Sequence, residues 1–195
     1  VASGTYTEQV NLGAVTGASS TNTITFQGGS STAASILTYT PASSSDNWTV
    51  KMTGTDYVTF DNLTITSGGS TYGRLIVYTD TVTNFNLTNC HLIGTTTSGS
   101  SGSTSSFRAG LYYAYPAVAA GNWHISDNTF DSVTYAVYVY GLGYGAGSGA
   151  DSVFVEDNTI NANYNGFYVR YAKYQKMHDN VINDINGNSL RHYAY

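Results

Sequence analysis

The sequence predicts an all-β protein, with little or no helix, that winds as a solenoid of short parallel strands. Apolar residues alternate with polar ones at a period of two, and no segment keeps helical spacing over three turns. β-branched and aromatic residues dominate the alternating stretches. A pair of strand-like phrases also recurs along the chain, with two strands expected per repeat, which is typical of stacked repeat architectures.

The first strand of each repeat is marked by a six-residue phrase that occurs five times. It reads apolar, polar, Asp or Asn, a variable residue that is Asn in the last three copies, polar and apolar. The fourth residues of the copies follow one another at steps of 27, 38, 30 and 22 residues. The extra length falls in two segments, a Thr/Ser/Gly-rich loop at 94–106 and a Gly-rich loop at 141–150. The copies begin at Phe60, Leu87, Ile125, Val155 and Met177.

A second, Tyr-rich strand follows each copy. Successive copies keep the same direction of pattern and lack the two-residue Asn-Gly turn of tight hairpins, so parallel stacking is expected. These strands lie at 74–78, 110–114, 136–140, 166–170 and 189–193. The side chains expected to point inward are Phe60, Leu87, Ile125, Val155 and Met177 on the first strand, and Leu75, Val77, Leu111, Tyr113, Val137, Val139, Phe167, Val169, Leu190 and His192 on the second.

One column of the repeat is expected to form an asparagine ladder. Asn128, Asn158 and Asn180 share the fourth position of the phrase, and Leu63 and Cys90 fill it in the earlier copies. A stacked Asn at a sharp bend satisfies backbone groups that would otherwise be buried without partners, and it tolerates left-handed dihedrals. We therefore interpret this column as structural.

The outward side of the Tyr-rich strands is the candidate binding surface. Because side chains alternate across a strand, the residues between the inward ones face solvent. Three uses of such a surface stay open here: stacking of tyrosines between coils, contact with another protein, and binding of a glycan. The candidate binding residues are Tyr78, Tyr112, Tyr138, Tyr140, Tyr168, Arg170 and Tyr193.

These repeats, with the opening segments 4–8 (GTYTE) and 24–28 (ITFQG), resemble the right-handed parallel β-helix proteins of the pectin-lyase-like superfamily over nearly the whole chain. The low charge and abundant Thr, Ser, Gly, Asn and Tyr are similar to large cell-surface proteins exported by Bacteroidetes-type bacteria. The resemblance implies a right-handed parallel β-helix and an extracellular, cell-surface location. In that family, chemistry takes place on the strand face that the tyrosines occupy here.

The sequence assigns no catalytic residue. Hydrolysis of a glycan needs two carboxyl groups across the scissile bond, and the assigned outward positions hold none. Arg170 and Arg191 are the weak candidates for a lyase base, although the pKa of an ordinary Arg is too high for that role. The motifs that methylesterases of the family carry are not found.

No metal site or cofactor is assigned either. Asp127, Asp157 and Asp179 form a column whose oxygens suit Ca²⁺, but a column of turn residues is the competing interpretation. The four histidines lack metal-ligand spacing. Cys90 is the only cysteine, so no internal disulfide forms, and a small buried side chain is expected at that position.

Length and charge bound the remaining choices. The 195 residues contain no linker, which indicates one domain at 1–195. The net charge of −5 disfavours nucleic acid, and no apolar run of about twenty residues predicts a transmembrane segment. Because neither end carries a polar cap, we expect a piece of a longer chain or a repeating subunit that associates end to end or with other surface proteins.

The function predicted from these observations is a non-catalytic structural or adhesive segment of a secreted bacterial surface protein. A Tyr-rich contact face is its working surface. The alternative is a polysaccharide lyase or hydrolase, or a glycan-binding module, acting on an extracellular polysaccharide.

Overall fold

The computed structural model describes residues 1–31, 34–95, 105–114, 120–141, 150–184 and 193–194. Within these residues the protein is all-β, apart from short 3₁₀ segments that include η2 (Ser44–Asp46) and η3 (Ser105–Arg108). Every pairing between its named strands is parallel. The prediction of parallel strands with little helix is therefore confirmed.

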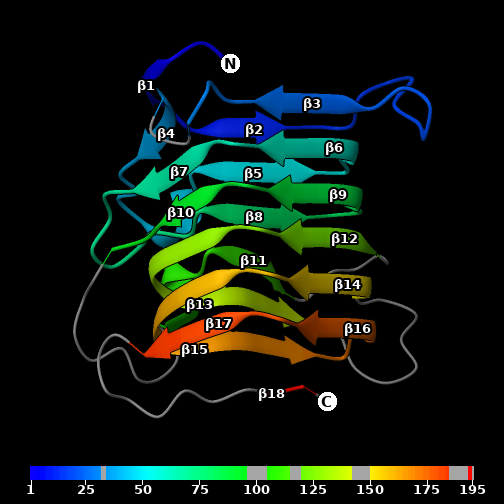
Figure 1. The fold of residues 1–195 in the computed structure, drawn as a ribbon. Coiled ribbons are helices and arrows are strands. Elements are labelled where there is room, and N and C mark those ends of the chain that lie inside the picture. The colour runs from blue at the N-terminus through cyan, green and yellow to red at the C-terminus, as the bar shows by residue number, and fades with distance from the viewer. Residues whose placement is uncertain (32–33, 96–104, 115–119, 142–149, 185–192, 195) are drawn as a thin grey trace.

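The strands form two curled sheets (Figure 1). The six-stranded sheet contains β3 (Ile24–Gln27), β6 (Asp56–Asp61), β9 (Thr83–Thr88), β12 (Ala120–Ser126), β14 (Ala150–Glu156) and β16 (Lys173–His178). The larger sheet has two arms, because the long strands β13 (Thr129–Tyr140) and β15 (Thr159–Arg170) each pair with both.

The first arm joins the beginnings of β13 and β15 to β1 (Gly4–Thr7), β4 (Ser35–Tyr39), β7 (Thr64–Ser67), β10 (His91–Ile93) and β17 (Val181–Asp184). The second arm joins their ends to β2 (Val10–Leu12), β5 (Val50–Thr53), β8 (Ile76–Thr79), β11 (Leu111–Ala114) and β18 (Tyr193–Ala194).

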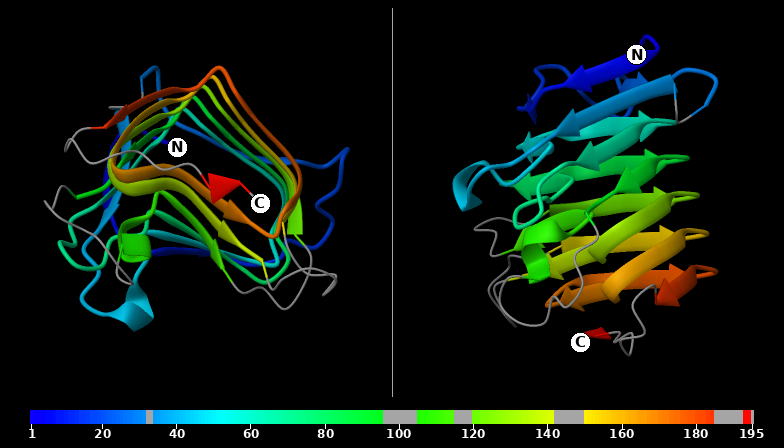
Figure 2. Two further views of the ribbon diagram at one scale, coloured as in Figure 1. Left: turned by 90° about the horizontal axis from the view of Figure 1, so that it is seen from below. Right: turned by 90° about the vertical axis from the view of Figure 1, so that its left-hand side faces the viewer.

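The chain passes through the first arm, the second arm and the six-stranded sheet in turn, and then begins the next round beside the previous one. Figure 2 shows the strands of successive rounds overlying one another around a shared interior, with the termini at opposite ends. The five copies of the phrase are aligned, since Phe60 pairs with Leu87, Leu87 with Ile125, Ile125 with Val155, and Val155 with Met177.

The first four rounds have three strands each, where two per repeat were expected. The rounds that begin with β13 and β15 have two, because each of these long strands spans both arms. The six-residue phrase crosses a corner, with its first residue in the six-stranded sheet and its last in the first arm. These last residues form a further row of inward side chains that sequence reasoning did not assign: Ile65, Leu92, Phe130 and Ile160, all buried. Each copy of the phrase therefore contains the end of a strand of the six-stranded sheet, a turn, and the beginning of a strand of the first arm.

A left-handed residue produces that corner in every copy. The third residue of the phrase has φ between 52° and 58° at Asn62, Asn89, Asp127, Asp157 and Asp179. Asn and Asp enter this region more easily than other side chains that carry a Cβ. The left-handed residue thus precedes the ladder position, whereas left-handed dihedrals were expected at the ladder Asn itself.

The expected inward positions agree with the structure in most rounds. Buried side chains include Phe60, Leu87, Ile125, Val155, Leu111, Tyr113, Val137, Val139, Phe167 and Val169, while Met177 is half-buried. Leu75 is also buried but lies before β8 begins. Leu190 and His192 lie outside the described residues.

The second arm needs one correction of register. Leu111 pairs with Ile76, and Tyr112 pairs with Val77, so Ile76 and Tyr78 rather than Leu75 and Val77 align with the inward residues. Tyr78 is 3% exposed and its ring contacts those of Phe85 and Trp123. The corner before β8 shifts the strand by one residue, which the Tyr-rich pattern alone does not reveal.

No helix in the described residues has the length and apolar character needed to cross a membrane.

Candidate functional site

The predicted asparagine ladder is present at the corner between the six-stranded sheet and the first arm. The Oδ1 atom of Asn128 accepts from the backbone N of Cys90 at 2.9 Å, that of Asn158 from the backbone N of Asn128 at 2.9 Å, and that of Asn180 from the backbone N of Asn158 at 3.0 Å. The Nδ2 groups donate to backbone carbonyls of the preceding round, as from Asn128 to Leu87 at 2.9 Å. Each amide therefore joins two rounds through buried backbone groups.

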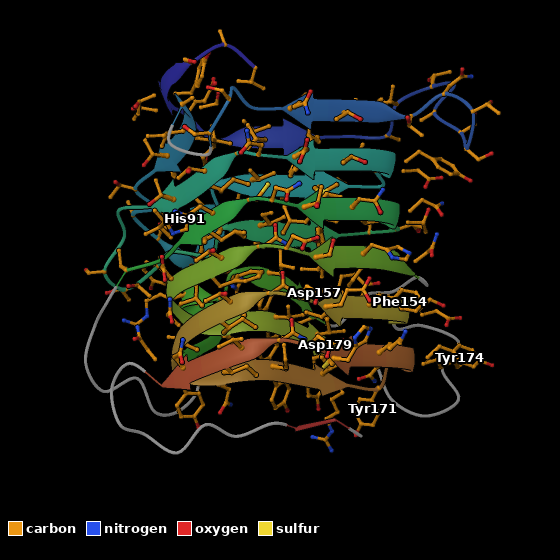
Figure 3. All side chains as sticks on the ribbon, in the orientation of Figure 1. His91, Phe154, Asp157, Tyr171, Tyr174 and Asp179 are labelled. Carbon is orange, nitrogen blue, oxygen red and sulfur yellow. The ribbon has the colours of Figure 1, made fainter. Side chains whose placement is uncertain are left out.

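The aspartates before the ladder lie on the outside. Asp127, Asp157 and Asp179 are exposed turn residues, and Figure 3 shows Asp157 and Asp179 one above the other on adjacent rounds. Their left-handed backbone accounts for the preference for Asp at this position. Among the residues that the structure describes, no three His, Cys, Asp or Glu side chains gather as a metal-binding group.

Three of the predicted surface tyrosines stack along the second arm. The rings of Tyr112 and Tyr138 have centroids 5.2 Å apart at 11°, and those of Tyr138 and Tyr168 are 4.7 Å apart at 9°. Their backbones are in register from β11 through β13 to β15. The sequence had aligned these residues correctly.

Arginines lie at both ends of the stack. The guanidinium of Arg74 lies 3.4 Å from the centroid of the Tyr112 ring and donates from Nε to the Ser106 carbonyl at 2.9 Å. Burial lowers the pKa of Arg74. Sequence reasoning missed this residue, because Arg74 stands at the corner before β8 and only the fold brings it over Tyr112.

Arg170 lies at the other end, on β15. Its guanidinium carbon is 5.5 Å from the ring centroid of Tyr140 and 4.7 Å from that of Tyr171. A hydrogen bond to the Tyr168 side chain raises the pKa of Arg170. The guanidinium therefore stays protonated, which suits binding of an anion and not abstraction of a proton.

We call the surface made by Arg74, Tyr112, Tyr138, Tyr140, Tyr168 and Arg170 the tyrosine face. All six side chains are half-buried.

Of the other predicted binding residues, Tyr78 was wrongly expected at the surface, because it lies in the core. The backbone of Tyr193 pairs with that of Tyr168. The sequence had predicted that Tyr193 aligns with Arg170, which lies two residues further along β15. Arg191 lies outside the described residues.

The ring geometry determines which atoms the tyrosine face presents. The central ring, Tyr138, has one face against Tyr112 and the other against Tyr168, and the outer face of Tyr112 is against Arg74. Sugars pack on ring faces, so this stack offers them no central platform. The outward groups of the stack are ring edges and phenol oxygens, repeated once per round at roughly 4.8 Å.

Two histidines lie near carboxylates outside this face. His91 Nε2 is 2.5 Å from Asp131 Oδ2 on the first arm, where Asn161 also donates to Asp131. His178 has Nδ1 2.6 Å from Asp179 Oδ2 and Nε2 2.8 Å from Glu156 Oε2. The hydrogen bond with Asp179 is the main cause that raises the pKa of His178, a surface group.

Cys90 fills the ladder column as the sequence analysis expected. Its side chain is 2% exposed, and burial raises the pKa of the thiol to about 12. A thiol of this kind is a packing group rather than a nucleophile at neutral pH.

No protein-family model, no curated protein and no solved structure matches this chain.

Proposed function

We propose that this chain is a right-handed parallel β-helix that serves as a non-catalytic structural or adhesive segment of a secreted bacterial surface protein. Its contact surface is the tyrosine face. Parallel strands that stay in register with the strand one round later support the β-helix assignment. The resemblance to the pectin-lyase-like superfamily supports it from the sequence.

The observation that carries the function is the face-to-face stack of Tyr112, Tyr138 and Tyr168. Because Tyr112, Tyr138 and Tyr168 use their ring faces on one another, their role is to stiffen the second arm and to present a row of hydroxyl groups beside cations. Tyr and Arg are the residues most enriched in protein contacts. We therefore assign this face to lateral contact with a neighbouring copy or another surface protein.

The end of the molecule near the N-terminus supports association along the axis. Strands β1, β2 and β3 each pair on one side only, with β4, β5 and β6. Between them opens an apolar hollow of about 350 Å³, lined by side chains that include Val10, Leu12, Phe26, Leu37 and Phe60. An unpaired strand edge around an apolar interior is completed by a further round of parallel strands. End-to-end self-association, which would supply such a round, is the arrangement that we propose.

Electron microscopy and sedimentation velocity over a range of concentrations test both contacts. Wild-type protein is expected to form end-to-end filaments that associate side by side. Phe26→Asp should abolish the filaments, whereas Tyr138→Ala with Tyr168→Ala should leave filaments that no longer associate laterally. Tyr57→Ala, which removes a tyrosine of β6, a strand that is paired on both sides and lies away from the tyrosine face, is the matched control and should behave as wild type. A chain that stays monomeric throughout contradicts the proposal.

A second candidate function is a lyase or hydrolase, or a binding module, acting on an acidic polysaccharide. The observation that favours it is the protonated Arg170 among Tyr140, Tyr168 and Tyr171, which suits a uronate carboxylate. Incubation with pectin and alginate, followed by assays for unsaturated and reducing ends, tests the enzyme. Absence of product with every polymer rules out the enzyme. Retention of the protein on polysaccharide gels that depends on Arg170 supports the binding module.

A further inference from the structure

The six-stranded sheet carries a polar groove on its outer side, away from the tyrosine face. A hollow of about 250 Å³ is lined by Tyr57, Thr59, Asn84, Asn86, Asn122 and His124, with Ser20 and Thr23 of the preceding loop along one side. A second hollow of about 260 Å³ shares Asn84 and Asn122 and continues to Ser152. We call the two together the asparagine groove.

A column of left-handed residues builds the groove. Tyr57, Asn84, Asn122 and Ser152 have φ of 54°, 51°, 54° and 61° at equivalent points of β6, β9, β12 and β14. These residues have no partner in the register of neighbouring strands. For example, Asp56 pairs with Thr83, and the next pair is Val58 with Phe85. The same position is thus unpaired in each strand without any shift of register, and its left-handed backbone interrupts the ordinary alternation of side chains.

Hydrogen-bonding atoms in the groove remain available. Asn122 donates to Asn84 Oδ1 at 2.5 Å, and Asn84 donates to Asp56 Oδ1 at 2.9 Å, so each amide orients the next. Asn86 donates to Thr59 Oγ1 at 3.2 Å. Within the described residues, the Oδ1 atoms of Asn86 and Asn122 have no hydrogen-bond donor.

The charge of the groove restricts its ligand. The hollow around Asn84, Asn86 and His124 contains no Lys, Arg, Asp or Glu side chain, and Asp151 is the one acidic residue along its continuation. No Lys or Arg side chain lines either hollow, so the groove offers no cation to an anionic ligand. Beside it, His124 stacks on Phe154 with centroids 4.7 Å apart at 15°, which gives the groove a rigid aromatic border.

We propose that the asparagine groove binds a neutral glycan lying along the axis of stacked strands. Amide and hydroxyl groups recur once per round, at roughly the 4.8 Å spacing of neighbouring strands, which is close to the length of one sugar unit in an extended chain. Neutral hydroxyl groups of the ligand are matched by Asn carbonyl and amide groups without any charge. The groove is independent of the contacts made by the tyrosine face.

The test measures binding of short soluble fragments of neutral β-glucan, xylan and mannan, and of acidic pectin and alginate, by calorimetry and by NMR shift changes. Asn122→Gly with Asn86→Ala removes the two acceptors, and Gly keeps the left-handed backbone at residue 122. The dissociation constant for a neutral fragment is expected to rise at least about tenfold.

Asn89→Gly is the matched control, because Asn89 is likewise exposed and left-handed, with φ of 52°, but lies at the opposite corner of the sheet. It and Tyr138→Ala should leave binding unchanged. The proposal is overturned if no neutral fragment binds, if only acidic fragments bind, or if the Asn89 or Tyr138 variant weakens binding as much as the groove variant.

Discussion

At the scale of single residues, the asparagine ladder shows why one amide matters more than most side chains. Asn158 accepts from the backbone N and Nδ2 of Asn128 and donates to the carbonyl of Ile125 at 2.9 Å and to Asn180 Oδ1. Asn128 and Asn158 are each 1% exposed. Water cannot replace the amide at such a position, so its loss leaves backbone groups unpaired.

Asn158→Ala is therefore expected to lower the free energy of unfolding by about 2–4 kcal/mol, because two buried backbone groups lose their partners. Asn183→Ala removes an exposed amide that donates to Asn161 and should change stability by less than about 0.5 kcal/mol. Urea denaturation followed by circular dichroism measures both. Equal losses for the two variants would show that the ladder is not a stabilising element.

The buried thiol of Cys90 gives a second expectation. With its pKa raised to about 12, the native protein should react with a thiol reagent at neutral pH at least about a hundred times more slowly than the unfolded chain. The rate with and without denaturant checks this. Fast labelling of the folded protein would mean that the ladder corner opens readily.

The His178 cluster predicts a pH dependence. Since folding raises the pKa of His178, the stabilisation from its charged form is complete below the ordinary pKa of the imidazole, and it is lost as pH rises through the elevated value. An NMR titration of the ring should give a midpoint above that of a free imidazole. Asp179→Asn weakens the hydrogen bond that is the main cause of the raised pKa, so it should lower the midpoint of His178. An unchanged midpoint would show that Asp179 does not raise this pKa.

At the scale of elements, the tyrosine stack couples β11, β13 and β15. Parallel strands already share backbone hydrogen bonds, and the rings add side-chain contacts along the same direction. Aromatic pairs contribute on the order of 0.5–1.5 kcal/mol each. This stacking contribution comes from the rings, while the phenol of Tyr168 also hydrogen-bonds to Arg170.

Tyr138→Phe should consequently retain stability within about 0.5 kcal/mol, whereas Tyr138→Ala should lose about 1–3 kcal/mol, because two stacked pairs disappear. Chemical denaturation of the purified variants compares them. A Phe variant as unstable as the Ala variant would place the energy in the hydroxyl group instead of the stack.

At the scale of the whole molecule, burial falls toward both ends. β8 has three buried residues of four, whereas β1 and β16 have none. In a stack of rounds each element is stabilised mainly by its neighbours, so the outer rounds open most easily. In the dilute, unassociated protein, amide hydrogen exchange should be fastest in β1 to β3 and in β16 and β17, and slowest in β8 to β13. Uniform protection along the chain would contradict this.

Much of this architecture was accessible from the sequence. The phrase beginning at Phe60 and its four later copies predicted the alignment of rounds and the Asn column, and the Tyr-rich strands predicted that Tyr112, Tyr138 and Tyr168 align. These signals are local and repeat with the same chemistry. Tyr78 and the number of strands per round were misjudged, because the corner before β8 shifts the alternation and the phrase itself turns a corner.

Alternation and repetition thus dictated an all-β chain of parallel strands with an internal asparagine column, since each pattern reflects which side chains avoid water within one short segment. Tertiary pairing alone decided that Arg74 covers Tyr112, that Tyr78 is buried, and that Tyr57, Asn84 and Asn122 line a groove. These placements depend on register between segments far apart in the sequence and on left-handed residues inside strands, which the alternation of apolar and polar residues does not reveal.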